Sequence, residues 1–302
     1  MIQFYGLSIM PKISVDKNTC IIVTGCCGQL GQAFEKHLKF FEKIHFLDKI
    51  KLNLTSEDSI AKAFKKYNPD VVINTAAYTN VDNAEVEREK ALIVNGSSLE
   101  NLTKYCKKYD ALLIHFSTDY VFDGSKLNGY LETDSPNPIN YYGQTKLHGE
   151  KVILNSKCSF LIFRISWLYS QYGKNFYKTI SKLSSEKKDI DVVNDQSGIP
   201  TSADFVVSKV YEILINTAIT EDNCNQIYHL APKRQATWCD FAKEIVKTNN
   251  NFCTVNPVSS ETFKTRAVRP KNSLLSSEKF EKSFKVDIKD WQHYYKASVR
   301  NN

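Results

Sequence analysis

Short apolar runs alternate with amphipathic segments along the first half of the chain. The run Cys20–Thr24 is continuous and rich in β-branched residues, which is typical of a parallel strand buried on both faces. The same reasoning predicts strands at 44–47, 71–74, 111–117 and 160–165, and helices at 30–41, 57–67, 84–109 and 142–154. This alternation predicts an α/β fold, a doubly wound Rossmann-type parallel sheet with helices on both faces.

The pattern becomes more polar and richer in proline after about residue 170. Strands are predicted at 189–194 and 225–229, and helices at 201–216 and 237–247, the latter capped by Thr237. We therefore divide the chain into an N-terminal tail (1–18), a dinucleotide-binding domain (19–170) and a remainder (171–302). The remainder is predicted to be mainly a smaller C-terminal substrate-binding lobe that also contributes late elements of the Rossmann sheet.

Composition narrows the class of partner and compartment. The 302 residues are 42% hydrophobic and carry a net charge of +7, from 40 basic and 33 acidic residues. The lysines are scattered, so we expect an anionic small molecule rather than nucleic acid. No apolar run reaches the roughly 18–20 residues that span a bilayer, and the eight cysteines form no C-x-x-C pair. We expect a cytoplasmic protein with reduced thiols and no membrane partner; no metal ligands are assigned, and a homodimer is left open.

A glycine-rich loop follows the first predicted strand. Its glycines, Gly25, Gly28 and Gly31, are spaced G-x-x-G-x-x-G, and Gln29 and Leu30 open the next helix. Such glycines permit a tight turn, close approach of a pyrophosphate and close helix–strand packing, while the helix N-terminus attracts the anion. The loop therefore predicts a dinucleotide site, in the spacing typical of extended short-chain dehydrogenases.

Two further segments complete the predicted cofactor site. Asp48 ends the second strand, where it could accept hydrogen bonds from the adenosine ribose and favour NAD, whereas Lys49 beside it could neutralise a 2′-phosphate and favour NADP. The residues alone leave the coenzyme undecided. Ala76, Ala77 and Thr79 follow the third strand, where small residues would let the chain pass close under the cofactor.

A tyrosine and a lysine lie four residues apart on a predicted helix. Tyr142 and Lys146 would share one face, and an ammonium one turn away would lower the pKa of the phenol towards neutrality. Thr118 ends the strand at 111–117, where its hydroxyl could orient a substrate carbonyl. Tyr141 is the rival acid, but its i+4 residue is the uncharged Thr145. With the glycine loop, these residues predict hydride transfer with Tyr142 as proton donor and Lys146 also holding the cofactor ribose.

Several motifs together resemble the dTDP-4-dehydrorhamnose reductase family. They are Pro69-Asp70-Val71-Val72-Ile73-Asn74, Ala76-Ala77-Tyr78-Thr79-x-Val81-Asp82-x-Ala84-Glu85, Ser117-Thr118-Asp119-Tyr120-Val121-Phe122-Asp123-Gly124, Tyr142-Gly143-x-Thr145-Lys146, Arg164-x-Ser166-Trp167-Leu168-Tyr169, Asn194-Asp195-Gln196-x-Gly198-x-Pro200-Thr201 and Arg269-Pro270-x-Asn272-Ser273. The resemblance spans about residues 20–294. It implies reduction of the 4-keto group of a nucleotide-bound 6-deoxy sugar, with NADPH preferred and NADH often tolerated.

The resemblance also assigns site residues. Thr118, Tyr142 and Lys146 match the family's catalytic group. Substrate contacts are implied for Val81, Thr118, Asp119, Trp167, Asn194, Gln196 and Arg269. Of these, Trp167 would lie against the sugar ring, the loop of Asn194 and Gln196 would shape the site, and Arg269 would suit the diphosphate.

Two alternatives keep the fold and change the function. The β regulatory subunit of methionine adenosyltransferase resembles the same family and binds a partner enzyme without catalysing reduction. Another nucleotide-sugar enzyme, an epimerase or dehydratase, is the second alternative. The motifs at 166–169 and 194–196 favour the reductase over the first. The absence of a glutamate after Thr118-Asp119 argues against a dehydratase.

Overall fold

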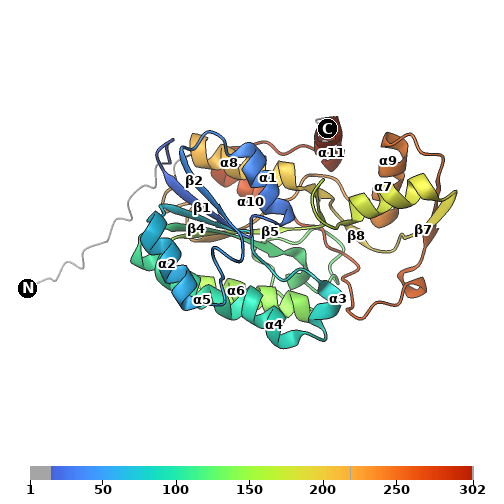
Figure 1. Cartoon of the computed structure of the whole chain (residues 1–302). Helices are drawn as coiled ribbons and strands as arrows, with labels where there is room; N and C mark the ends of the chain where they lie inside the picture. The colour runs from blue at the N-terminus through green and yellow to red at the C-terminus, as the bar shows by residue number, and fades with distance from the viewer. Residues whose placement is uncertain (1–14, 218, 301–302) are drawn as a thin grey trace, which may run out of the picture.

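A six-stranded parallel sheet forms the centre of the molecule (Figure 1). The structure, a computed structural model, describes residues 15–217 and 219–300, so most of the predicted tail lies outside the described residues. The strands are β1 (Cys20–Thr24), β2 (Lys43–Leu47), β3 (Val71–Asn74), β4 (Leu112–Thr118), β5 (Phe160–Ile165) and β10 (Gln226–His229). They lie in the order β10-β5-β4-β3-β1-β2, with every neighbouring pair parallel.

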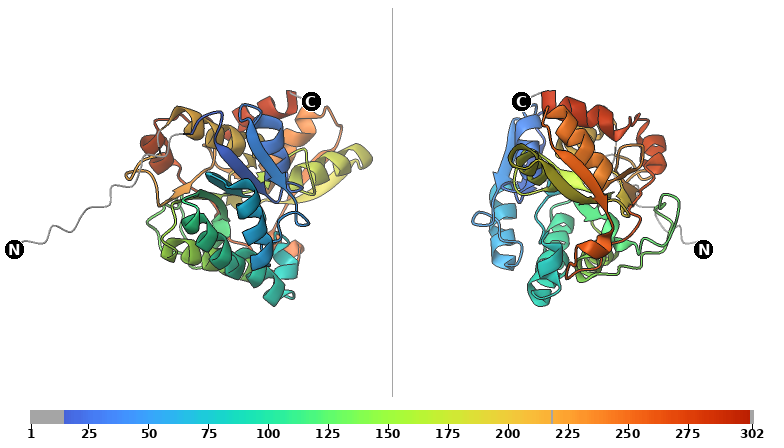
Figure 2. Two further views of the ribbon diagram at one scale, coloured as in Figure 1. Left: turned by 60° about the vertical axis from the view of Figure 1, so that its left-hand side comes forward. Right: turned by 90° about the vertical axis from the view of Figure 1, so that its right-hand side faces the viewer.

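Helices cover both faces of this sheet, as Figures 1 and 2 show. One face carries α1 (Gln29–His37), α8 (Ala203–Asn216) and α10 (Glu278–Phe284); the other carries α2 (Glu57–Tyr67), α5 (Ser98–Lys108) and α6 (Tyr141–Asn155). Alternate strand residues feed the two layers: Ile21 and Val23 join the core under α1 and α8, whereas Ile22 joins the core under α2 and α5. The predicted doubly wound fold is confirmed.

The helix predicted at 84–109 is wrong as a single element. The chain instead forms α3 (Val81–Ala84), α4 (Arg88–Leu92), the π-helix η1 (Ile93–Ser97) and α5. The π turn presents the buried Asn95, whose side chain accepts from the Tyr78 N–H (2.7 Å) and donates to the Tyr78 carbonyl (2.9 Å). Apolar periodicity does not detect such an insertion, because the partner that stabilises it comes from a distant loop.

Apart from α8, β10 and α10, the elements after β5 build a second, smaller layer beside the sheet, around α7 and α9 at the right of Figure 1. They comprise β6 (Leu168–Tyr169), α7 (Phe176–Glu186), β7 (Asp189–Val193), β8 (Ser197–Gly198), β9 (Thr201–Ser202), β11 (Ala236–Thr237), α9 (Trp238–Thr248), β12 (Thr254–Val258), η3 (Ser260–Thr262) and α11 (Trp291–Arg300). β7 pairs with β12 in parallel, and an aromatic-rich core joins α7, α9 and α11. Thr237 caps α9 in a capping box with Asp240, as predicted for its N-terminus. The boundary at residue 170 stays a prediction.

None of the helices within 15–217 and 219–300 has the length and apolar character needed to cross a membrane. The cytoplasmic location stays a prediction. So does the homodimer.

Candidate active site

The glycine loop, the loop after β3 and Thr118 all lie at the carboxyl edge of the sheet. Thr24 ends β1, Asn74 ends β3 and Thr118 ends β4, and a short 3₁₀ turn, η2 (Asp119–Val121), follows β4. β2 lies on one side of β1, and the chain then crosses over to place β3 on the other side. The order of the strands therefore reverses between β1 and β3. In doubly wound sheets this is where ligands bind.

The glycine loop has the geometry of a pyrophosphate cradle. Gly25 has a φ of +66°, and a Cβ there would lie 2.7 Å from the Ala76 backbone; a Cβ on Gly31 would lie 2.5 Å from the Gly25 carbonyl oxygen. Gly28 precedes α1 in an extended conformation without a side-chain cap. The first N–H groups of α1 are therefore left for an anion, which fits the phosphates of a dinucleotide.

The remaining loop residues tie this cradle to its surroundings. Gln29 Oε1 accepts from Ser170 Oγ (2.9 Å) and Asn175 Nδ2 (2.8 Å), which links the loop to the second layer. Leu30 is buried in the core. Cys27 is exposed and Cys26 half-buried, with burial raising the pKa of Cys26 to about 11.

The adenosine side of the predicted site is more open. Asp48 follows β2, and its Oδ1 accepts from the N–H groups of Ile50 and Lys51 at 3.0 and 2.9 Å, which leaves Oδ2 for a ribose. Lys49 is exposed beside it. Both of the opposing coenzyme signals are thus in place at the end of β2.

The loop after β3 passes close under the glycine loop. Ala76 and Ala77 are half-buried and Thr79 is exposed. The close approach of Ala76 to Gly25 explains why only small side chains suit this crossing.

The start of α6, the helix that carries Tyr142 and Lys146, is held by segments far away in the chain. Asn140 caps it, with Oδ1 accepting from the Gly143 N–H (2.8 Å) and Nδ2 donating to the Val268 carbonyl (2.9 Å). Glu85 Oε1 accepts from the Tyr141 N–H at 2.7 Å. These bonds fix the turn from which Tyr142 projects.

Thr118 and Asp119 form a buried polar pair beside that turn. Thr118 Oγ1 donates to Asp119 Oδ1 (2.9 Å) and accepts from the Tyr120 N–H (3.2 Å). Asp119 Oδ2 has no hydrogen-bond partner among the described residues. Burial raises the pKa of Asp119 to about 6, although hydrogen bonds from Ser273 and Thr118 oppose the shift.

Tyr142 and Lys146 occupy one side of α6, but the predicted effect of the lysine on the phenol is not seen. Burial and then the negative charge of Asp119 raise the pKa of Tyr142, while the Thr118 hydroxyl lowers it. Lys146 turns towards the sheet, where Nζ donates to the Phe116 carbonyl at 2.6 Å. Burial lowers the pKa of Lys146 itself to about 8. Spacing on the helix missed this difference because it does not report which way a long side chain turns.

Trp167 is the most constrained of the predicted substrate residues. Its φ is +46°, a conformation that bulky residues rarely adopt and that clusters at functional sites. Its ring stacks on Trp238 with centroids 3.6 Å apart and planes 7° apart, and a Cβ on Gly198 would lie 2.3 Å from the ring. One face of the indole is therefore taken by protein, which restricts any sugar contact to the rest of the ring.

Arg269 is already engaged by a carboxylate. Its Nη2 lies 2.7 Å from Asp82 Oδ2 and its Nη1 3.2 Å from Asp82 Oδ1, and Nη1 also donates to the Ala267 carbonyl. The predicted fork is thus oriented by Asp82, and the guanidinium retains donors beyond those that Asp82 occupies.

The other predicted substrate residues lie further along the same edge or in the second layer. Val81 opens α3 next to Asp82. Asn194 Oδ1 accepts from Thr237 Oγ1 at 2.9 Å, so it holds the cap of α9. Gln196 is half-buried just before β8. This contact of Asn194 thus lies within the second layer.

Comparison with known proteins decides the family. The protein-family model described as "RmlD substrate binding domain" matches residues 19–302. The dTDP-4-dehydrorhamnose reductase of Escherichia coli (strain K12) is 34% identical over 282 residues, which are 90% of this chain and 94% of that protein. The chain belongs to the dTDP-4-dehydrorhamnose reductase family.

Solved structures agree with this family. The dTDP-4-dehydrorhamnose reductase of Bacillus anthracis, solved in complex with NADP, superposes with a TM-score of 0.89 at 31% identity, covering 94% of this chain and all of that one. The UDP-glucose 4-epimerase of Thermus thermophilus superposes with a TM-score of 0.74, covering 90% and 96%, but at 16% identity it shares the fold alone. The expected oxidoreductase class and the expected NADP-type cofactor are confirmed at the level of the family.

Three residues that help to build the candidate site were missed or not assigned a role from sequence. Asn95 joins the loop after β3 to α6, since its Nδ2 lies 3.0 Å from Thr145 Oγ1; Glu85 binds the start of α6; and His115 contacts Lys146. Only His115 left a local signal, because it is a polar residue inside the apolar run of β4. The partners of Asn95 and Glu85 depend on long-range packing.

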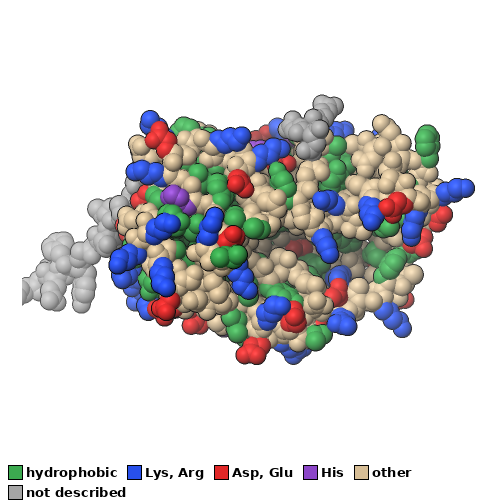
Figure 3. All heavy atoms as spheres, viewed as in Figure 1, with side chains coloured by type: hydrophobic (Ala, Val, Ile, Leu, Met, Phe, Trp, Pro, Cys, Tyr) green, Lys and Arg blue, Asp and Glu red, His purple; other side chains and the backbone are tan. Residues whose placement is uncertain are grey.

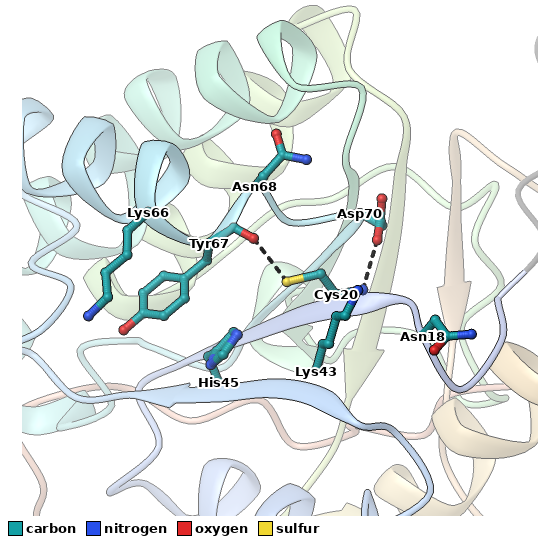
Figure 4. A pocket seen from close by; sticks show the side chains of 8 residues that line it. All are labelled: Asn18, Cys20, Lys43, His45, Lys66, Tyr67, Asn68 and Asp70. Carbon is teal, nitrogen blue, oxygen red and sulfur yellow. Dashed lines mark hydrogen bonds between the residues drawn. The ribbon is translucent and has the colours of Figure 1, made fainter.

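A separate hollow of about 460 Å³ lies at the opposite edge of the sheet (Figure 4). It is lined by Asn18, Cys20, Lys43, His45, Lys66, Tyr67, Asn68 and Asp70. Within it the Cys20 N–H donates to Asp70 Oδ2 and Cys20 Sγ donates to the Tyr67 carbonyl. It lies at the amino ends of β1 to β3, away from the glycine loop, and is not the candidate active site.

Surface charge does not single out a further binding site on the face seen in Figure 3. On the face seen in Figure 3, lysine and arginine side chains are spread among acidic ones, and the surface is hollowed near its middle, towards the α7 and α9 side. Within 15–217 and 219–300, no group of three or more His, Cys, Asp and Glu side chains is placed to hold a metal ion.

Proposed function

We propose that the protein reduces the 4-keto group of dTDP-4-dehydro-L-rhamnose to give dTDP-L-rhamnose, with NADPH as the reductant. The observation that carries this proposal is the assembly of Thr118, Asp119, Tyr142 and Lys146 beside the Gly25–Gly31 cradle. Relatives named dTDP-4-dehydrorhamnose reductase act on this sugar nucleotide, whereas the UDP-glucose 4-epimerase of Thermus thermophilus shares the fold at only 16% identity.

The cradle residues Gly25, Gly28, Gln29, Leu30 and Gly31 would hold the pyrophosphate. Asp48 and Lys49 would meet the adenosine ribose, and Ala76, Ala77 and Thr79 would lie along the dinucleotide. Bound NADPH would supply the hydride. This assignment follows from the uncapped start of α1 and from the crossing of Ala76 over Gly25.

Tyr142 would donate the proton to the alkoxide that forms at C4. Its burial and the nearby Asp119 keep the phenol protonated at neutral pH, which is the state that a proton donor requires. Thr118 would orient the substrate oxygen, and Asp119, with one oxygen free, would accept a hydrogen bond from a sugar hydroxyl. Trp167, Val81, Asn194 and Gln196 would surround the sugar nucleotide, and Arg269 would bind its diphosphate.

An assay of NADPH and NADH oxidation with dTDP- and UDP-linked 4-keto-6-deoxy sugars tests this proposal, with the product identified by NMR. We expect Tyr142→Phe to lower kcat by about 10²–10⁴-fold, the usual cost of losing a general acid. Tyr141→Phe is the matched control, since its neighbour one turn on is Thr145, and should retain activity.

Three results would redirect the assignment. Near-normal turnover by Tyr142→Phe would remove the tyrosine from the mechanism. Epimerised or dehydrated product would favour another nucleotide-sugar enzyme. Specific capture of a methionine adenosyltransferase catalytic subunit, with no reduction of any sugar nucleotide, would favour the regulatory role.

A further inference from the structure

A stacked pair of indoles joins the candidate site to the second layer. Trp167 lies two residues beyond β5, and Ile165, the last residue of β5, faces Thr118 in the register of β4 and β5. The Trp167 ring lies against Trp238, the first residue of α9, with centroids 3.6 Å apart and planes 7° apart. Among the described residues, Trp238 is the one aromatic side chain that stacks on Trp167. The pair therefore bridges the carboxyl edge of the sheet and the second layer.

The backbone of Trp167 has a strained conformation that needs support. Its φ is +46°, and in this left-handed region the Cβ of a side chain crowds the following carbonyl oxygen. Such a conformation persists only where neighbouring contacts hold it. The Thr201 N–H donates to the Trp167 carbonyl at 3.2 Å. Ser166 Oγ, one residue earlier, donates to the Ile199 carbonyl (3.1 Å) and accepts from the Ile199 N–H (3.2 Å). The side chain has the corresponding support in its stack with Trp238.

The Trp167 ring lies in a slot with no spare space. A Cβ on Gly198 would lie 2.3 Å from the indole, so β8 places bare backbone against the ring. Gly198 faces Ala236 in the antiparallel pair of β8 and β11, and α9 begins two residues after Ala236. This short ladder fixes both walls of the slot, Gly198 and Trp238. Because Trp167 is only 9% exposed, a small part of its ring can meet a ligand, and a small displacement would withdraw that part.

The core of the second layer holds Trp238 in turn. Trp238 is half-buried against the aromatic-rich core of α7, α9 and α11, and its ring lies 4.5 Å from that of Phe176, the first residue of α7. It directly follows Thr237, the cap of α9, whose Oγ1 lies 2.9 Å from Asn194 Oδ1. The loop of Asn194 is thereby connected to Trp167 through the first turn of α9.

We propose that Trp238 is a positioning residue for the sugar nucleotide: its stack holds the indole of Trp167 in the orientation in which the exposed part of that ring meets the sugar. The identity of the ligand rests on the proposed function, whereas the stack and its effect on Trp167 are properties of the protein without substrate. Trp238 touches no reacting atom in this role. Its loss should therefore weaken substrate binding more than it slows the chemical step.

Fluorine-19 NMR of the full chain labelled with 5-fluorotryptophan tests the stack. Trp167→Phe, Trp238→Phe and Trp291→Phe each remove one of three signals and so assign it. Trp291 is the internal control, because it packs on Phe241 within the core of the second layer. We expect the Trp167 signal to move in Trp238→Leu and on addition of dTDP-L-rhamnose, and to move less with dTDP alone, while the Trp291 signal stays in place. A Trp167 signal that ignores Trp238→Leu would overturn the proposal.

Trp238→Leu also tests the consequence for the substrate, since leucine keeps apolar volume without an aromatic face. In the reductase assay we expect the KM for the nucleotide sugar to rise about tenfold while the KM for NADPH changes less. Trp238→Phe, which retains a ring for stacking, should recover most of the loss. Trp238→Met takes the place of Trp238→Leu if the latter does not fold.

Trp291→Phe, which alters a tryptophan of the same core, is the matched control for these kinetics and should leave both KM values near those of the parent. An unchanged nucleotide-sugar KM in Trp238→Leu contradicts the proposal. So does an equal rise in Trp291→Phe, which would indicate general loosening of the second layer.

A double-mutant cycle separates positioning from direct contact. If Trp238 acts through Trp167, Trp167→Leu should raise the KM for the nucleotide sugar, and adding Trp238→Leu should raise it little further. Effects that multiply would mean that Trp238 contacts the ligand itself, which overturns the positioning role. If the protein reduces no sugar nucleotide, the proposed function fails, while the fluorine signal of Trp167 still decides whether Trp238 holds it.

Discussion

Two rows of buried polar side chains lie under α6, on the same face of the sheet. In one row the charged groups pair with each other, and in the other the charged group has only neutral partners. The first runs from Ser117 through Glu150 and Arg164 to His229, and its two ions pair directly, with Arg164 Nη2 2.7 Å from Glu150 Oε2. The second runs from Thr24 through Asn74 and His115 to Lys146, where every hydrogen-bond partner of the one cation is neutral.

The two buried histidines follow the same contrast. His229 Nδ1 faces a carbonyl oxygen, which leaves Nε2 as an acceptor towards Arg164 at 3.5 Å. His115 Nε2 instead lies 3.3 Å from the amino group of Lys146, which has no carboxylate partner among the described residues. A buried ion with a partner keeps its charge and supports the fold, whereas a buried amine without one is costly when charged and has a protonation state that shifts easily. We therefore call the row of Glu150 and Arg164 the scaffold row, because its ion pair supports the fold. The row that ends at Lys146 is called the working row, because it reaches the candidate site.

The largest effect is expected from breaking the scaffold pair. Glu150→Gln leaves the Arg164 charge buried without a counter-ion, which typically costs about 3–5 kcal/mol. Chemical denaturation at pH 7 measures this loss. The exposed pair Lys182–Glu186 on α7 is a matched control, and Glu186→Gln should change stability by less than about 0.5 kcal/mol. Equal effects of the two substitutions would remove the distinction between buried and exposed pairs.

Removing the charge of Lys146 should have the opposite effect and stabilise the folded protein at neutral pH. The folded pKa of Lys146, about 8, lies below its ordinary 10.5, so the folded protein gains stability as pH rises between these values. Lys146→Met lacks this cost, and its stability relative to the parent should fall by about 3 kcal/mol from pH 7 to pH 10.5. Denaturation curves at both pH values measure it. A difference independent of pH would mean that the lysine is charged and fully compensated in the fold.

Asp119 should behave as the acidic counterpart of Lys146. Its folded pKa, about 6, lies above the ordinary 3.8, so its contribution to stability is complete below about pH 4 and is lost as pH rises through 6. Asp119→Asn removes that loss, and should gain about 2.4 kcal/mol relative to the parent between pH 4 and pH 7. Urea denaturation at the two pH values provides the measurement. A gain of the same size at pH 4 would indicate better packing rather than removal of a buried negative charge.

The smallest effect is expected at Arg269, whose pair with Asp82 is only partly buried. Arg269→Ala should raise the KM for the nucleotide sugar by about tenfold, or about 1.4 kcal/mol, with a smaller change in kcat and in the KM for NADPH. Steady-state kinetics with each substrate varied in turn separates these values. Lys271→Ala, which removes an exposed cation two residues away, is the control; an equal effect there would point to general attraction of anions.

Much of the fold could be predicted because the signals are local. The ranges of β1, α2, β3 and β5 agree with their apolar patterns, since burial on one or both faces imposes a period that neighbouring residues share. The turn at Gly25 was equally readable, because a positive φ with a backbone atom 2.7 Å from the Cβ position leaves room only for glycine. Motifs of this kind also indicated the family.

The chemical state of the site was not readable in the same way. The spacing of Tyr142 and Lys146 identifies a shared helix side, but not that Lys146 turns towards Phe116 and His115 instead of acidifying the phenol. The sequence predicts that the Arg269 guanidinium is free to bind a diphosphate. In the structure, Asp82, 187 residues earlier in the chain, already orients it. Likewise the π turn at Asn95 has no periodic signature.

The sequence by itself determined which residue types stand at the ends of the strands and where the backbone must turn, because those demands act over a few neighbouring positions. Only the tertiary structure decided how these residues meet. The row from Thr24 to Lys146 exists because the registers of β1, β3 and β4 align three polar residues and α6 lays a lysine over the last. Burial then removes the water that would otherwise keep the pKa values of His115 and Lys146 near their ordinary values. Long-range packing, in addition to residue identity, therefore sets the charge at the site.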